Sequence, residues 1–295
     1  MARFGLGQAG RFVLGLLGMG LIAAAVSALA APHGHYPAAL LARLADVAKL
    51  DFGPSTMAGT SAAAELARRL PATLELLGAG FAFALVLGAP LGLALSSGRV
   101  LRAAAPLIQI VAAAPVFCAG LVLIYIAVKA FGWRDLSFTG TSLFDAAMSG
   151  DASALGHAFR VLVLPVAIVG GAGAACVNLA IRRALDEAAE QPYRRGLRLM
   201  GLPALDIDAF YVAPHVLARV LADLGEIARA LIAAAVVVES VFGWPGAADL
   251  FVKSVALHDW NVVALILVLF AVIALAAELI GNLSAALLTP AERAP

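Results

Sequence analysis

Residues 182–219 read RRALDEAAEQPYRRGLRLMGLPALDIDAFYVAPHVLAR, a polar stretch with long apolar runs on both sides. Its arginines, carboxylates and three prolines exclude lipid as its solvent. Five of the arginines fall in its first seventeen positions, next to an apolar run, where the positive-inside rule places cytoplasmic charge. Pro192 suits the first position of a helix, and Gly201 suits the residue after its end. The stretch therefore predicts a short helix presented on the cytoplasmic face, with a plain solvated connector as the alternative.

The composition indicates an integral membrane protein of the all-α class. Of 295 residues, 63% are hydrophobic and 13% are charged, about half the charged share of a soluble domain. A net charge of +1 gives no indication of nucleic acid binding. Cys118 and Cys176 show no metal-site spacing, and the histidines fall mostly in loops or near span ends, which argues against an intramembrane enzyme. The sequence predicts no metal, no catalytic residue and no cofactor in this chain.

The apolar runs predict a single domain, residues 1–295, with six membrane-spanning helices. Five runs reach the length of about 20 residues that a bilayer core requires, and a sixth is needed to return the chain across the membrane. The expected spans are residues 12–31, 72–97, 105–131, 159–181, 217–242 and 261–288, with a cytoplasmic loop at 182–216. The balance of charges in the loops then places both termini in the cytoplasm. We expect Pro71 to open the second span. The first run also has the features of a secretory signal, whose removal would leave five spans.

Charged side chains interrupt the fifth expected span. At helical spacing, Arg219, Asp223, Glu226 and Arg229 share one stripe, which must face protein or water because lipid penalises charge. Two interpretations remain open. The stripe either forms ion pairs at i, i+3 and i, i+4 spacing or lines a polar pathway. Glu278 adds a polar position in the last span, and an ion-coupled secondary transporter would use it together with Glu226 and Arg229.

The segment after the fifth span predicts a structure over the outer end of the bundle. Trp244 suits the aromatic belt at the membrane interface, and Pro245 with Gly246 suits a turn. A short helix over residues 247–257 would then fold back over the mouth of a pathway, as a lid or as an ordinary interface helix. The expected lid or gate residues are Glu239, Phe242, Trp244, Pro245 and Gly246.

Three segments carry a resemblance to one family. They are KLDFGPS at residues 49–55, RLPATLEL at residues 69–76 and VVVESVFGWPGAADLFVKSVALHDW at residues 236–260. In order and spacing they resemble signatures of the permeases of dipeptide, oligopeptide and nickel type ABC importers. The resemblance covers nearly the whole chain, most weakly residues 1–45 and 132–157. It implies a type I ABC importer permease fold in the bacterial cytoplasmic (inner) membrane, with peptides or a related small solute as cargo.

The resemblance also assigns a role to the polar stretch. It implies a coupling helix that docks on an ATPase subunit, and the matching residues are Tyr193, Arg194, Arg195, Arg198, Gly201 and Leu202. In this register the EAA tripeptide that begins at Glu187 is a chance match. Leu199 stands where a small residue is usual and Met200 where a lysine is usual, which implies weaker or more specialised docking.

The partners follow from the same resemblance. It implies a second homologous permease, two ATP-binding cassette ATPase subunits that hold ATP and Mg, and an extracytoplasmic solute-binding protein. The sequence contains no GxxxxGK[ST] loop, so if ATP drives the transport, another chain must hydrolyse it. The direction of transport rests on the resemblance alone.

Overall fold

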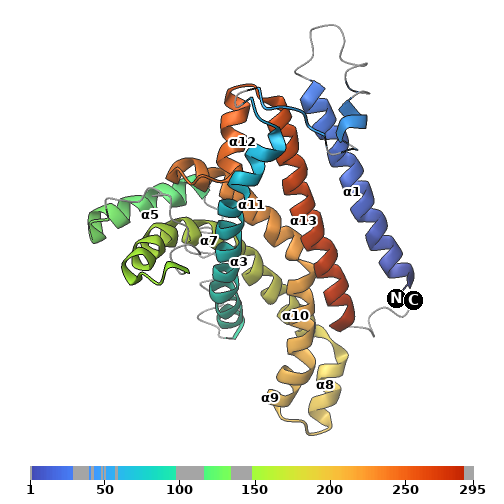
Figure 1. The fold of residues 1–295 in the computed structure, drawn as a ribbon. Helices are drawn as coiled ribbons and strands as arrows, with labels where there is room; N and C mark the ends of the chain where they lie inside the picture. The colour runs from blue at the N-terminus through green and yellow to red at the C-terminus, as the bar shows by residue number, and fades with distance from the viewer. Residues whose placement is uncertain are drawn as a thin grey trace.

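The computed structural model describes residues 2–28, 40, 43–47, 49, 51–56, 59–97, 116–133 and 148–288. Within these ranges the regular elements are helices, apart from one isolated bridge between Pro54 and Ser61. In chain order they are α1 (Ala2–Ala28), α3 (Ala62–Ser97), α5 (Val116–Phe131), α7 (Ala152–Glu190), α8 (Pro192–Leu199), α9 (Ala204–Ile207), η1 (Asp208–Val212), α10 (Ala213–Ala222), α11 (Leu224–Phe242), α12 (Ala247–Ala256) and α13 (Trp260–Leu288). The all-α class is confirmed. Helices α12 and α8 lie at opposite ends of the molecule (Figure 1).

The described helices give four membrane spans by length and composition. These are α1, α3, α7 and α13, and a fifth arises if α11 and α12, bent by 75°, count as one broken span. The apolar helix α5 is shorter, and residues 105–115 of the third expected span lie outside the described residues. Arg99 and Arg102, whose charges place the loop before that span in the cytoplasm by the positive-inside rule, lie outside them as well. The six-span count and the type I fold therefore remain predictions.

Helix α3 begins ten residues before the expected second span, at Ala62. Pro71 lies inside the helix, so the expectation that it opens the span is wrong. The Ser61 hydroxyl accepts a hydrogen bond from the Ala64 N–H at 3.2 Å, which caps the true start. Glu65 then pairs with arginines one turn further on. Hydropathy detects only the part of a helix that lipid can solvate, so this polar first portion was missed.

Helix α7 also continues beyond its expected limit at residue 181. It runs to Glu190 and carries the first nine residues of the polar stretch as helical turns. At its start, the Asp151 carboxylate accepts the Ser153 N–H at 2.8 Å and caps the helix. The connection to α8 consists of Gln191 alone, so α8 is attached almost directly to a membrane-spanning helix.

The fifth expected span, residues 217–242, is divided into two helices. The break falls at Asp223, which has φ −89° and ψ 7° between α10 and α11. Two glycines allow this region to pack closely against α13. A Cβ on Gly225 would lie 2.6 Å from the Glu278 Cβ, and one on Gly281 would overlap the Leu221 carbonyl oxygen. The change of direction and the close approach of α13 therefore occur at the same level.

Small residues also bring α3 and α7 into close contact. A Cβ on Gly88 would lie 2.8 Å from the Ala174 carbonyl oxygen, and one on Gly92 would lie 3.0 Å from Ile181. From the other side, a Cβ on Gly170 would lie 2.8 Å from the Gly80 carbonyl oxygen. Close backbone approach of this kind drives helix association in lipid, where burying apolar surface gives no advantage.

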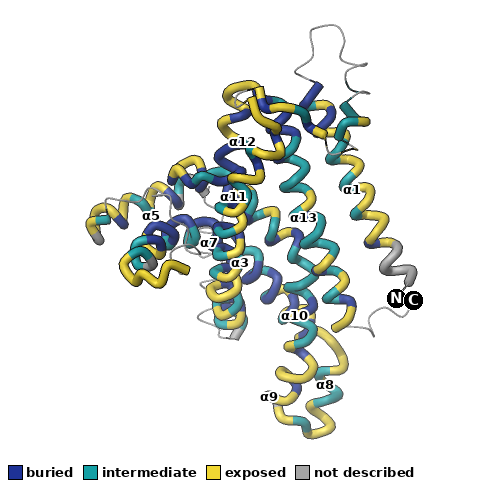
Figure 2. The backbone as a smooth tube through the Cα atoms, in the orientation of Figure 1, coloured by how far each residue is buried: buried dark blue, intermediate teal, exposed yellow. Residues whose placement is uncertain are grey.

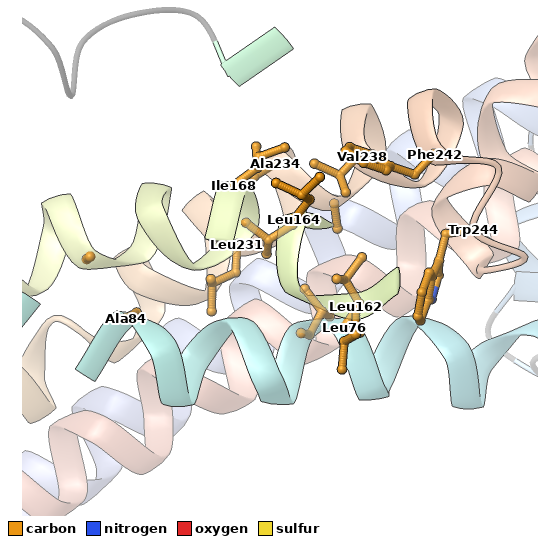
Figure 3. Close-up of a cluster of buried hydrophobic side chains, with 14 of the residues drawn as sticks. Leu76, Ala84, Leu162, Leu164, Ile168, Leu231, Ala234, Val238, Phe242 and Trp244 are labelled. Atoms are coloured by element: carbon orange, nitrogen blue, oxygen red, sulfur yellow. The ribbon is translucent and has the colours of Figure 1, made fainter. Parts of the chain in front are cut away.

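A hydrophobic cluster joins α3, α7 and α11 on the side facing α12. Figure 3 shows Leu76 of α3, Ile168 of α7 and Val238 of α11 directed toward one another, with Trp244 at one end of the group. These side chains are buried. The cluster fixes the start of α12 because Trp244 belongs to the turn that leads into it.

Candidate functional site

The α12 end is organised around the carboxylate of Glu239, which has no solvent exposure. One oxygen accepts a hydrogen bond from the Thr73 hydroxyl at 2.8 Å. The other accepts from the backbone N–H groups of Ala248 at 2.8 Å and Asp249 at 2.9 Å. Glu239 therefore caps α12 from the preceding helix, at the end where a negative charge is favoured. Gly246, the residue before α12, has no side chain that could cap the helix itself, and a Cβ on it would overlap the Glu239 carboxylate.

Further bonds tie the turn before α12 to α3. The indole N–H of Trp244 donates to the Ala72 carbonyl oxygen at 2.9 Å, and the Ala247 N–H donates to the Thr73 hydroxyl at 2.7 Å. Trp244 is only 2% exposed. Both its ring and its N–H are therefore used inside the protein, and its expected depth at the membrane interface stays a prediction. Phe242 is buried as well.

Ion pairs continue the same connection on α12. Asp249 is buried and its carboxylate lies 3.2 Å from Arg69 of α3 and 2.6 Å from Lys253, one turn along α12. An acid in the first turn of a helix is also favoured by the helix dipole. The short helix that the sequence predicted over residues 247–257 is confirmed as α12, and the bend of 75° turns it back from α11.

The segment at residues 51–56 meets the other side of this assembly. The Ser55 hydroxyl donates to the Asp259 carboxylate at 2.6 Å, and the Asn261 amide donates to the Pro54 carbonyl oxygen at 3.0 Å. Phe52 packs in a cluster with residues of α12 and α13. The three sequence segments that carry the family resemblance are therefore joined in space by hydrogen bonds at one end of the bundle.

The α8 end has the opposite character. Helix α8 begins at Pro192, and Gly201 after it adopts φ +82°, as the sequence predicts. No residue of α8 is buried, and Leu199 and Met200 at its end are 84% and 76% exposed. Figure 2 shows the α8 and α9 region mainly in the exposed and intermediate classes. The structure therefore presents this helix to the surroundings.

The base of α8 is nevertheless held in place. The Arg194 guanidinium donates to the Asp208 carboxylate at 2.7 Å. Leu197 and Leu202 pack against a small cluster formed by Ala188, Ile207 and Val212. Of the predicted coupling residues, Arg194 and Leu202 thus serve the attachment of α8. The exposed set is Tyr193, Arg195, Arg198 and Gly201.

Sequence reasoning missed Glu187 as a structural residue. Its carboxylate lies 3.5 Å from the Arg219 guanidinium and 3.7 Å from the His215 imidazole, both on α10. It therefore links the last turns of α7 to the helix that returns to the membrane. Its partners lie 28 and 32 residues further along the chain, and no local spacing in the sequence indicates contacts at that distance.

The charged stripe forms ion pairs at the spacings that the sequence suggested. Arg219 lies 3.4 Å from Asp223, and Arg229 lies 3.1 Å from Glu226. Arg229 also lies 3.0 Å from Glu278 of α13, a pair between helices. Within the described ranges, no group of three or more His, Cys, Asp or Glu side chains is placed to hold a metal ion.

Comparison with known families decides the class of protein. The profile described as "Binding-protein-dependent transport system inner membrane component" matches residues 80–293. The chain belongs to this family. The prediction of a membrane permease of the ABC transport type, and not an enzyme, is therefore confirmed. Such a component works in a transport complex with other subunits.

Relatives carry names from peptide and polyamine transport. The probable D,D-dipeptide transport system permease protein DdpB of Escherichia coli K12 is 32% identical over 229 residues, covering 72% of this chain and 67% of the relative. The oligopeptide transport system permease protein OppB of Mycobacterium bovis is 29% identical over 253 residues, covering 82% and 76%. The putrescine export system permease protein SapB of Escherichia coli K12 is 28% identical over 232 residues, covering 72% of each chain. The comparisons give no support to an ion-coupled secondary transporter.

Proposed function

We propose that this chain is one permease subunit of an ATP-driven importer for peptides or a related small solute. The observation that carries the proposal, given the family, is α8: a short helix at one end of the bundle, fixed at its base and with no residue buried. An exposed helix with a fixed base suits a subunit that receives force from a partner.

The surface of α8 suits docking in a groove of an ATPase. Leu199 and Met200 offer apolar contacts, and Arg195 and Arg198 lie on the same short helix. Apolar anchors surrounded by charged side chains are typical of protein interfaces. ATP and Mg belong in the two partner ATPase subunits. Their movement would reach the membrane through α7, which is separated from α8 by Gln191 alone.

The α12 end suits the outer mouth of the pathway. In this assignment α8 and both termini lie in the cytoplasm of a bacterium, and the chain crosses the inner membrane six times. The outer lid would consist of Glu239, Phe242, Trp244, Pro245 and Gly246 together with α12. It would close the outer side and meet the extracytoplasmic binding protein that delivers cargo. A second homologous permease would complete the pathway, because one small bundle leaves little room for a peptide.

The nature of the cargo and the direction of transport are part of the proposal. Two of the relatives described above are named for dipeptide and oligopeptide transport, which favours peptides. A third relative is named for putrescine export, so export is the alternative direction that the transport experiment must distinguish from import. The charges at Asp223, Glu226, Arg229 and Glu278 are engaged in ion pairs, which favours a structural role over lining the pathway.

The experiment is uptake of a radiolabelled peptide library into liposomes that contain the whole transporter. We expect uptake that requires ATP and the ATPase subunits. Gly201→Val should reduce uptake at least tenfold while the complex still assembles, because a β-branched residue strains the left-handed conformation at φ +82°. Gly150→Val is the matched control, since Gly150 also has a positive φ of +68° with open space around a Cβ and lies before α7, away from α8. Uptake without ATPase subunits, or full uptake by Gly201→Val, would contradict the proposal.

A further inference from the structure

A polar cleft of about 520 Å³ lies between α1, α7, α11 and α13. Charged side chains from all four helices line it, namely Arg11, Arg183, Asp223, Glu226, Arg229 and Glu278. The ion pairs described above account for only part of them.

Among the described residues, the ion pairs of the cleft leave two of its arginines without a carboxylate partner. Asp223 is paired with Arg219, and the carboxylates of Glu226 and Glu278 both lie on Arg229. In the part of the chain that the structure describes, neither Arg11 nor Arg183 makes an ion pair. The cleft therefore offers two guanidinium groups, from α1 and α7, to an anion from outside the protein.

The depth of the cleft indicates where that anion comes from. Glu278 lies 18 residues along α13 from Trp260, at the α12 end, and Arg11 lies 17 residues along α1 from Ala28. At 1.5 Å per residue these positions are about 27 Å and about 26 Å from the α12 ends of their helices. The hydrocarbon core of a bilayer is about 30 Å thick. The cleft thus lies close to the level of the lipid headgroups on the α8 side.

We propose that this cleft binds the phosphodiester group of a membrane phospholipid. The guanidinium groups of Arg11 and Arg183 donate to the phosphate oxygens. Arginine suits this contact better than lysine, because its planar guanidinium can donate two parallel hydrogen bonds to one phosphate. The acyl chains extend from Arg11 toward the α12 end along the apolar surface of α1, over the exposed side chains of Leu14 and Leu17. The bound lipid ties α1 to α7, the helix that carries α8.

The chemistry of the headgroup is set by the neighbouring acids. Glu226 and Glu278 already share Arg229, so a second anionic group on the lipid would meet repulsion there. A single phosphate with a neutral or amine-bearing substituent fits the cleft, and its amine would approach Glu226, whose side chain is 66% exposed. Phosphatidylglycerol and phosphatidylethanolamine both meet this description.

Lipid retention by the purified complete transporter tests the proposal. The transporter is delipidated in detergent, incubated with dioleoylphosphatidylglycerol and analysed by native mass spectrometry for bound lipid. We expect wild type to retain lipid and the double variant Arg11→Gln/Arg183→Gln to retain at least fivefold less. The matched control is Arg68→Gln/Arg160→Gln, which removes two exposed arginines from α3 and α7 outside the cleft and should retain lipid as wild type does.

Two further arms make the result decisive. Arg11→Lys/Arg183→Lys keeps both charges, loses the fork geometry and should lower retention two- to threefold, which provides a readout if the glutamine pair does not purify. Inorganic phosphate in hundredfold excess should leave the lipid in place. Equal retention by the Arg11/Arg183 variants and the control would overturn the proposal. So would displacement of the lipid by inorganic phosphate, because the cleft would then recognise a free anion.

Discussion

The two ends of this molecule handle polar groups in opposite ways. At the α12 end a buried carboxylate, Glu239, is surrounded by donors from α3 and α12, and each of its oxygens has a partner. At the α8 end the side chains of Tyr193, Arg195, Arg198 and Leu199 remain exposed. The contrast teaches that the α12 end satisfies its buried polar groups within this chain. The α8 end leaves its polar groups accessible from outside, as the proposed docking requires.

The largest expected effect comes from removing the buried carboxylate. Glu239→Ala leaves two backbone N–H groups and the Thr73 hydroxyl without their acceptor in a buried site, and each such group costs about 1–3 kcal/mol. We expect a loss of at least about 3 kcal/mol in the free energy of unfolding. Chemical denaturation of the purified chain in detergent measures it. Ser240→Ala is the control, because its exposed hydroxyl bonds only to the Val236 carbonyl oxygen one turn back.

A smaller loss is expected at the residue on α3 that faces the carboxylate. Thr73→Val removes the donor to Glu239 and the acceptor for the Ala247 N–H without changing side-chain shape. This should cost about 2 kcal/mol, and Thr73→Ser should recover most of it because the hydroxyl is kept. Equal stability of the valine and serine variants in the same denaturation experiment would show that the network does not hold the α12 end.

The α8 end should tolerate the loss of an ion pair. Arg194→Ala breaks the contact of 2.7 Å with Asp208, whose side chain is 53% exposed. The Arg194 side chain is 21% exposed, and a pair with one exposed partner contributes about 1 kcal/mol and is partly screened by salt. We expect the difference between variant and wild type to shrink further in 0.5 M NaCl. A loss comparable with that of Glu239→Ala would erase the contrast between the two ends.

The smallest effect on stability is expected at the end of α8. Leu199→Ser/Met200→Ser changes two exposed side chains and should alter the free energy of unfolding by less than about 0.5 kcal/mol. The same variant should reduce peptide-stimulated ATP hydrolysis of the complete transporter several-fold, because apolar contact with the ATPase is lost. An unchanged ATPase rate would show that these side chains are not the docking surface.

Local structure was predictable where local chemistry decides it. Pro192 and Gly201 fixed both limits of α8 from sequence, and the turn before α12 followed from Pro245 and Gly246. Helix lengths were less predictable, because α3 and α7 continue as polar helices past the lipid and hydropathy does not register that portion. The division at Asp223 was hidden as well, since it coincides with the close approach of α13 at Gly281, a contact between residues distant in the sequence.

Contacts between distant residues account for the rest of the difference. Thr73 and Glu239 are 166 residues apart, and Arg229 and Glu278 are 49 apart. No pattern in one sequence specifies such pairs. The resemblance grouped the segments that contain Thr73 and Glu239 without saying that they touch. The burial of Trp244 was not predicted for the same reason, because its acceptor, the Ala72 carbonyl oxygen, is a backbone atom that residue types do not reveal.

The glycine contacts between α3 and α7 restrict how this protein can change shape. With backbones in contact from Gly80 to Gly92, neither helix can rotate or slide against the other without steric overlap. A conformational change would then carry the two helices as one rigid body. Within the described residues, the helices that pack against them are interrupted at Asp223 between α10 and α11 and at Gly243 between α11 and α12, where flexing is expected. Those two joints are the places to attach spectroscopic probes of the transport cycle.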